Sequence, residues 1–121
     1  MIFSTFGLFK QRLLLTKFLD KISTDKTAVF WGKKHPKRRK LAHILRLPLL
    51  NLEDGFLRSL GLGVAGYPPY SIVYDDIGIY YDTTRPSRLE QLILAADTMP
   101  SETLAQAQQA MDFILQHHLS K

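Results

Sequence analysis

Cysteine is absent from the 121 residues of this chain. Without cysteine the chain cannot form disulfides, build zinc sites of the CxxC type or use a thiol nucleophile. The absence agrees with a reducing compartment, so the cytoplasm is the expected location. Histidine occurs only four times, never at ligand spacing, and the HExxH and DxD patterns are missing. We therefore expect no protein-bound metal and no resident cofactor.

Long apolar runs are also missing. The longest stretch without a charged residue, 59–74, has 16 residues and contains three glycines and two prolines, so it cannot form a membrane-spanning helix. The apolar start, residues 1–9, has no basic segment before it, which argues against a signal peptide. A chain of this length is expected to form one compact domain.

Acidic residues are scarce in the first half of the chain. Residues 1–50 hold 12 Lys and Arg but only two acidic residues, whereas the remainder holds four basic and nine acidic residues. Such an asymmetry predicts that the first half faces an anionic partner, such as phosphate, lipid headgroups or nucleic acid. The charge pattern does not distinguish among these partners.

Hydrophobic periodicity predicts the elements of the first half. Residues 8–22 have apolar positions near helical spacing, and 27–31 and 48–52 are short apolar runs typical of buried strands. Between these runs, a proline opens a basic helix over 36–46. The order strand, helix, strand with short links predicts a parallel α/β unit.

The second half predicts a hairpin followed by helices. Residues 71–74 and 79–81 are strand-like and flank a polar turn that would place Gly78 at positive φ. Ser87 and Glu90 form the S-x-x-E pattern of a capping box, which predicts a helix that begins directly after Ser87. From residue 100 onward, one apolar stripe on a polar sequence predicts a long final helix.

Six cations within eight residues form the basic run at 33–40. This run could neutralise phosphates of nucleic acid, attract the chain to an anionic membrane surface, bind a small anion or form a solvated helix face. Nucleic acid is the less favoured partner, because only Trp31 offers a stacking aromatic nearby and no nucleic-acid motif is recognised. The candidate anion contacts are Lys33, Lys34, Lys37, Arg38, Arg39 and Lys40.

A second candidate site follows the strand predicted at 48–52. Glu53 and Asp54 could supply a general acid or base, and Arg58 could hold a carboxylate or phosphate. Open α/β sheets place their ligands where parallel strands end, which favours a functional cluster here. A strand-to-loop cap with a surface ion pair remains the alternative. Arg85, just before a predicted helix, is a further candidate anion ligand.

Five segments follow one another in a fixed order and spacing along the chain. They are WG at 31–32, LLNLEDGFLRSLGLG at 49–63, PPYS at 68–71, DDIGIYYD at 75–82 and RPSRLE at 85–90. Together they resemble the capsule polysaccharide β-Kdo transferases of Gram-negative bacteria, of the KpsC/LipA type. The resemblance covers nearly the whole chain and is most specific over residues 53–90.

The resemblance implies a cytoplasmic glycosyltransferase that takes CMP-Kdo as donor and builds a β-linked Kdo linker on a lyso-phosphatidylglycerol-type acceptor for capsule export. It implies a GT-B-like module with two Rossmann-type halves. Residues 1–121 would form an incomplete acceptor-side α/β domain with short parallel strands, a hairpin and C-terminal helices. The segment with the catalytic aspartate and the nucleotide-binding half lie outside the match, so the chain alone is expected to be inactive.

The resemblance also implies roles for particular residues. By position Glu53 resembles the second carboxylate of the retaining mechanism and would move a proton to or from the acceptor hydroxyl. Asp54 would shape the loop and Arg58 would draw the acidic sugar, with Ser59 and Arg85 as further substrate contacts.

Partners follow from the charge and from the incomplete module. The basic half would face the anionic inner leaflet, where the lipid-linked acceptor lies, so peripheral membrane contact is expected. The missing half of the module would leave apolar surface, which favours self-association. The alternative function is a stand-alone module that binds lipid or nucleic acid through residues 33–40.

Overall fold

The computed structural model describes residues 1–5, 8–9, 12–20, 24, 26–57 and 70–119. The chain divides into two compact units, Met1–Glu53 with Val73–Leu89 and Asp54–Ile72 with Glu90–Lys121. The strands are β1 (Ile2–Phe3), β2 (Ala28–Trp31), β3 (Leu49–Asp54) and β4 (Ile72–Asp75). The helices are α2 (Arg12–Leu19), α3 (Pro36–Ile44), α4 (Arg88–Leu94) and α5 (Ser101–Gln116), with a 3₁₀ turn at Ala96–Thr98.

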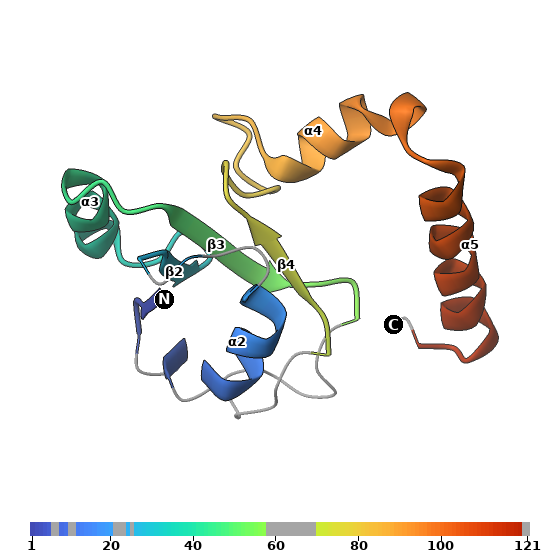
Figure 1. The fold of residues 1–121 in the computed structure, drawn as a ribbon, viewed down its shortest axis with the longest axis horizontal. Coiled ribbons are helices and arrows are strands. Elements are labelled where there is room, and N and C mark those ends of the chain that lie inside the picture. Colours follow the sequence, from blue (N-terminus) through green and yellow to red (C-terminus); the bar gives the residue numbers. More distant parts are fainter. Residues whose placement is uncertain (6–7, 10–11, 21–23, 25, 58–69, 120–121) are drawn as a thin grey trace. The chain divides into compact units, whose positions relative to one another are not determined.

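A four-stranded sheet in the order β1-β2-β3-β4 organises the first unit. The strands β1, β2 and β3 are parallel, and α3 connects β2 to β3 in Figure 1. Along β2 and β3 the register pairs Ala28 with Leu49 and Trp31 with Leu52. The predicted strand-helix-strand unit is therefore confirmed, and the fold is a mixed α/β fold with a mostly parallel sheet.

The core lies on both faces of β2 and β3, as expected for strands within a parallel sheet. Val29 and Leu52 are completely buried, and Phe30 is nearly so. Ala28, Phe30 and Ala42 of α3 form one buried cluster. The apolar runs read from the sequence therefore form the buried strands, and the helices α2 and α3 overlap the helices predicted at 8–22 and 36–46.

The predicted hairpin is wrong in its second strand. Residues 79–81 form a turn, and Gly78 is not among the residues with positive φ. The carboxylate of Asp75 accepts the backbone N–H groups of Ile77 (2.9 Å) and Gly78 (2.7 Å), and Asn51 donates to the Gly78 carbonyl at 2.6 Å. Polar side chains thus satisfy backbone groups that a strand would have paired. Gly78 is required for another reason, because a Cβ there would collide with the Pro86 carbonyl.

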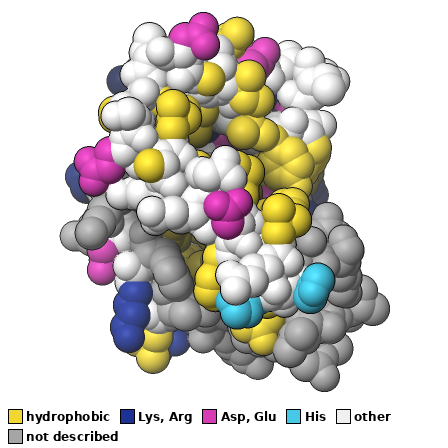
Figure 2. All heavy atoms as spheres, turned by 90° about the vertical axis from the view of Figure 1, so that its right-hand side faces the viewer, with side chains coloured by type: hydrophobic (Ala, Val, Ile, Leu, Met, Phe, Trp, Pro, Cys, Tyr) yellow, Lys and Arg dark blue, Asp and Glu magenta, His cyan; other side chains and the backbone are white. Residues whose placement is uncertain are grey.

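The two C-terminal helices begin where the sequence predicts. The carboxylate of Asp75 accepts the backbone N–H of Arg88 at 2.9 Å, so a distant aspartate satisfies a donor at the start of α4. Every residue of α5 except Ile114 is exposed, and Figure 2 shows hydrophobic side chains on the face that carries this helix. Within the described part of the chain, no helix is long and apolar enough to span a membrane.

Candidate functional site

An open pocket of about 520 Å³ lies in the first unit, where β2 and β3 end. The register pairs Trp31 with Leu52, so the residues that follow each of them meet at the carboxyl edge of the sheet. Glu53, the catalytic candidate of the sequence, lies in this pocket and is half-buried. The pocket is lined by Trp31, Gly32, Lys33, Lys34, Glu53, Tyr80 and Tyr81.

Gly32 allows two oxygen atoms to approach the backbone on one side of the pocket. It has a positive φ of 58°, a conformation that glycine adopts without steric cost. A Cβ at this position would lie 2.9 Å from Glu53 Oε2 and 2.9 Å from the Tyr81 hydroxyl oxygen. The carboxylate and the phenol therefore flank the same backbone position.

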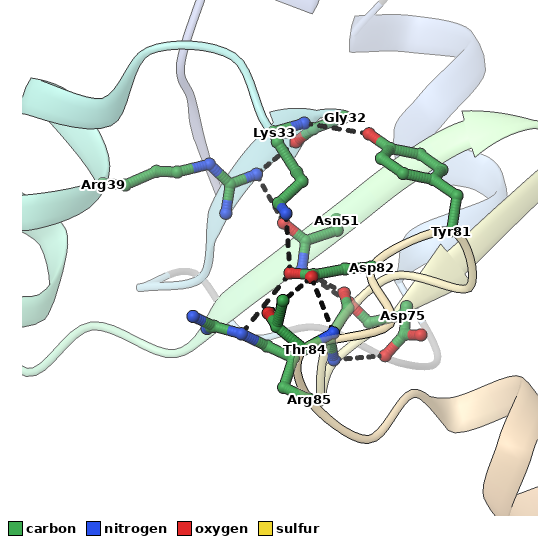
Figure 3. Close-up of polar contacts among 10 residues, drawn as sticks. Gly32, Lys33, Arg39, Asn51, Asp75, Tyr81, Asp82, Thr84 and Arg85 are labelled. Atoms are coloured by element: carbon green, nitrogen blue, oxygen red, sulfur yellow. Dashed lines mark hydrogen bonds and ion pairs between the residues drawn. The ribbon is translucent and has the colours of Figure 1, made fainter.

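Tyr81 reaches the pocket from the turn that follows β4. Its hydroxyl oxygen accepts the backbone N–H of Lys33 at 3.1 Å, a contact between residues 48 positions apart (Figure 3). Burial raises the pKa of the phenol, and the charge of Glu53 raises it further. The phenol therefore stays protonated at neutral pH, so it remains a hydrogen-bond donor.

A buried aspartate next to the pocket fixes the loop that follows β2. Asp82, whose side chain is 3% exposed, lies 2.8 Å from Lys33 Nζ and 3.5 Å from Arg85 Nε. It also accepts the Thr84 hydroxyl at 2.6 Å and the Thr84 backbone N–H at 3.2 Å. The hydrogen bond from Lys33, followed by those from Thr84, holds the pKa of this carboxyl well below its usual range.

A network beneath the pocket joins α3 to the sheet. Arg39 donates to the carbonyl of Gly32 and to Asn51 Oδ1, the latter at 2.6 Å, and its guanidinium lies 4.5 Å from the Phe30 ring centroid. Asn51 donates in turn to the carbonyls of Gly78 and Asp75. Burial lowers the pKa of Arg39. The network therefore holds the ends of both strands that form the pocket (Figure 3).

The six cations of the basic run divide among different environments. Arg38 donates to the Ser4 carbonyl and Arg39 to Gly32, so these two side chains hold the backbone. Lys33 pairs with Asp82, and Lys34 lines the pocket. Lys37 and Lys40 are exposed on α3. The six cations therefore differ in their contacts, and their role as contacts for an anionic surface stays a prediction.

Two other predicted site residues, Asp54 and Arg85, do not line the pocket. Asp54 is half-buried at the end of β3 and is not among the residues that line the pocket. Arg58 and Ser59 lie outside the described residues. Arg85 has a side chain that is 66% exposed and lies 3.5 Å from Asp82.

Sequence reasoning missed several residues that build the site. Tyr81 was assigned to a strand, and the pairing of Lys33 with Asp82 joins positions too distant for a local pattern to reveal. The sequence does indicate a role for Asn51, because it is a polar residue within the apolar run that forms β3. A buried amide in a central strand requires hydrogen-bond partners, which here are Arg39, Asp75 and Gly78.

A mostly parallel sheet with a polar pocket at the ends of its strands defines an α/β protein, and this edge of the sheet is where open α/β folds place their ligands. Comparison with known proteins gives the family. Residues 26–121 match the family described as capsule polysaccharide biosynthesis protein, and the chain belongs to this family.

Relatives of this chain include two named capsule and lipopolysaccharide proteins. This chain is 82% identical over 95 residues to the capsule polysaccharide modification protein LipA of Neisseria meningitidis serogroup B. The match covers 77% of this chain and 14% of LipA. It is 41% identical over 100 residues to the lipopolysaccharide-processing protein LpsZ of Rhizobium meliloti, a match that covers 81% of this chain and 23% of LpsZ.

Two solved structures of KpsC from Thermosulfurimonas dismutans share the fold. The β-Kdo 2,4 transferase superposes with a TM-score of 0.78 at 37% identity, over 100% of this chain and 41% of that chain. The β-Kdo 2,7 transferase superposes with a TM-score of 0.58 at 27% identity, over 99% of this chain and 43% of that chain. The chain thus spans less than half of each solved relative.

Proposed function

We propose that this chain forms the acceptor side of a glycosyltransferase that transfers Kdo from CMP-Kdo to a lipid-linked acceptor and so builds the β-Kdo linker of a capsule. Membership of the capsule polysaccharide biosynthesis family supports the proposal, as does the likeness to two enzymes named as β-Kdo transferases. The site must supply acid or base chemistry and must recognise an acidic sugar.

The observation that carries the proposal is the position of Glu53 and its lack of hydrogen-bond partners among the described residues. Its half-buried carboxylate lies in the pocket, and the structure gives it no hydrogen bond or ion pair within the part of the chain described. A carboxylate committed to a cation or to backbone donors would have fewer lone pairs left for a ligand. Glu53 is therefore available to take a proton from, or return one to, a hydroxyl of the acceptor sugar.

The remaining lining residues suit an acidic sugar. Lys34 contributes a charge that attracts the carboxylate of Kdo, and Trp31, Tyr80 and Tyr81 provide apolar area for the ring. Arg58 is proposed as a second contact for the acidic sugar and Arg85 as a contact at the rim.

The proposed reaction needs more than the described pocket. Retaining transfer uses a carboxylate nucleophile in addition to the acid or base, and the resemblance assigns that nucleophile to a segment outside the match. We therefore propose that residues 1–121 alone do not turn over CMP-Kdo. We also propose that the protein acts in the cytoplasm against the anionic inner leaflet, where the exposed Lys37 and Lys40 can contact headgroups.

Binding of a Kdo glycoside by the chain tests the location of the acceptor site. We expect Lys34→Met to weaken binding about 10-fold, because a charge-assisted contact contributes more than a neutral one. The matched variant Lys37→Met removes the same charge from the same basic run, outside the pocket, and is expected to leave the affinity unchanged. Isothermal titration calorimetry at two salt concentrations measures both effects.

The stand-alone anion module predicts the opposite pattern. In that case Lys37→Met would weaken binding as much as Lys34→Met, and the affinity would fall steeply with ionic strength. Anionic vesicles would then compete with the glycoside. That outcome would contradict an acceptor site in the pocket of Glu53.

A further inference from the structure

The hydroxyl of Tyr81 has a proton that its hydrogen bond with Lys33 does not use. Its oxygen accepts the N–H of Lys33, which leaves the phenolic proton to donate elsewhere. Within the described residues, the structure gives that proton no acceptor. A tyrosine that lines a pocket, whose oxygen is held by a backbone donor and whose proton has no acceptor, can donate that proton to a ligand.

The second observation is the short separation between Tyr81 and Glu53. Both oxygens lie 2.9 Å from the same point, the Cβ position that Gly32 leaves empty, so they are at most twice that distance apart. A hydroxyl group can bridge two oxygens that are each about 2.8 Å from it, because it accepts one hydrogen bond and donates another. The upper limit on the separation is therefore compatible with one sugar hydroxyl that bridges the phenol and the carboxylate.

We propose that Tyr81 is a substrate-binding residue that donates a hydrogen bond to the acceptor hydroxyl whose own proton faces Glu53. This inference rests on the proposed function of the pocket. The phenol accepts from Lys33, donates to the sugar oxygen and leaves the proton of the sugar directed at the carboxylate. Tyr81 thereby selects the hydroxyl that meets the base, which makes it a determinant of the linkage formed.

The surroundings of Tyr81 hold this geometry in place. Lys33, whose backbone N–H binds the phenol, is anchored through its side chain to the buried Asp82, the residue that follows Tyr81. The same two segments are therefore joined twice. Such preorganisation lowers the entropy lost when the sugar binds. Burial and the nearby charge of Glu53 both raise the pKa of Tyr81, so the phenol remains a donor over the neutral range.

A double-mutant cycle tests the inference by combining single protein variants with single changes to the ligand. The methyl β-glycoside of Kdo and analogues that each lack one hydroxyl are titrated into the chain, its Tyr81→Phe variant and its Tyr74→Phe variant. We expect Tyr81→Phe to weaken binding of the parent glycoside about 5- to 30-fold, the range for one hydrogen bond that the bound sugar shields from water. One analogue should bind wild type weakly and show no further loss with Tyr81→Phe, because the same hydrogen bond has already been removed.

Tyr74→Phe is the control, and failure of the inference can be told apart from failure of the proposed function. Tyr74 is a 43% exposed tyrosine of β4 that does not line the pocket, so Tyr74→Phe should bind like wild type. If Tyr81→Phe weakens every analogue by the same factor, or none, the inference is wrong although the pocket binds Kdo. If wild type itself does not bind the glycoside, the proposed function fails and the inference with it. Thermal melts of all variants confirm that each is folded.

Discussion

Asp82 receives donors from three residues while its side chain is almost completely shielded from water. Lys33, Thr84 and Arg85 all direct nitrogen or hydroxyl groups at it. Its environment favours the charged carboxylate so strongly that its pKa falls well below the ordinary value. A single residue thus joins the loop after β2 to the turn after β4, and these are the two segments that carry Lys33 and Tyr81.

A stability difference that depends on pH follows from this lowered pKa. A carboxyl with a depressed native pKa stabilises the fold above the unfolded-state value, near pH 4, and the contribution is lost as the pH falls toward the native pKa. We expect Asp82→Asn to lower the melting temperature at pH 7, with the deficit shrinking steadily below about pH 4. Calorimetric melts from pH 7 to pH 2 measure this profile.

The matched control is Asp97→Asn, which removes an exposed carboxyl from the 3₁₀ turn. Its melting temperature should follow wild type at every pH. A deficit in Asp82→Asn that stays constant down to pH 2 would show that the carboxylate charge does not hold the two segments together.

At the scale of elements, Asn51 determines how α3, β3 and the turn after β4 fit together. Its amide accepts from Arg39 and donates to the carbonyls of Gly78 and Asp75, all within the interior of the first unit. Removal of such a group leaves buried partners without hydrogen bonds, which costs more than the bond itself contributes.

We expect Asn51→Ala to lower the free energy of unfolding by roughly 1–3 kcal/mol, the cost of leaving buried polar groups unpaired. Gln108→Ala provides the control, since that amide binds Asp112 on the exposed surface of α5 and its loss should cost less than about 0.5 kcal/mol. Urea denaturation measures both. Equal losses in the two variants would contradict the role assigned to Asn51.

Local sequence patterns predict most helices and strands, because neighbouring residues determine where each of these elements forms. The apolar runs at 27–31 and 48–52 became β2 and β3, and Pro36 begins α3 as expected. The turn at 79–81 escaped prediction because its apolar and aromatic residues resemble a strand, while the groups that prevent a strand come from Asn51 and Asp75. Side chains from other segments settle what local propensity leaves open.

In the candidate site too, local sequence predicts some residues, whereas contacts between distant segments determine others. Glu53 was predicted because it follows a strand of a parallel sheet, and the structure places it in a pocket. Tyr81 and Lys33 could not be assigned to that pocket from sequence, because the contact between them spans 48 positions. The contacts of Arg39 with the Phe30 ring and the Gly32 carbonyl could not be predicted either, because the basic run around Arg39 indicates only a charged segment.

On the scale of the whole molecule, the chain spans only part of the length of its relatives. It covers 41% of a β-Kdo 2,4 transferase and 14% of LipA, and the pocket of Glu53 belongs entirely to its first unit. The face of α5 exposes Leu104, Met111 and Leu115, each more than half accessible. We propose that this chain recognises the acceptor and that the complete reaction needs further parts of the module.

Transfer of Kdo by a complete module tests the central claim most directly. Meningococcal LipA with its matching segment replaced by this chain is incubated with CMP-Kdo and a Kdo-phosphatidylglycerol acceptor, and products are weighed by mass spectrometry. The account predicts an added Kdo, a rate reduced at least about 100-fold by Glu53→Gln, and an unchanged rate in the exposed control Glu102→Gln. Residues 1–121 alone should give no product. Turnover by Glu53→Gln within a few-fold of the parent, or Kdo transfer by the isolated chain, would contradict the account.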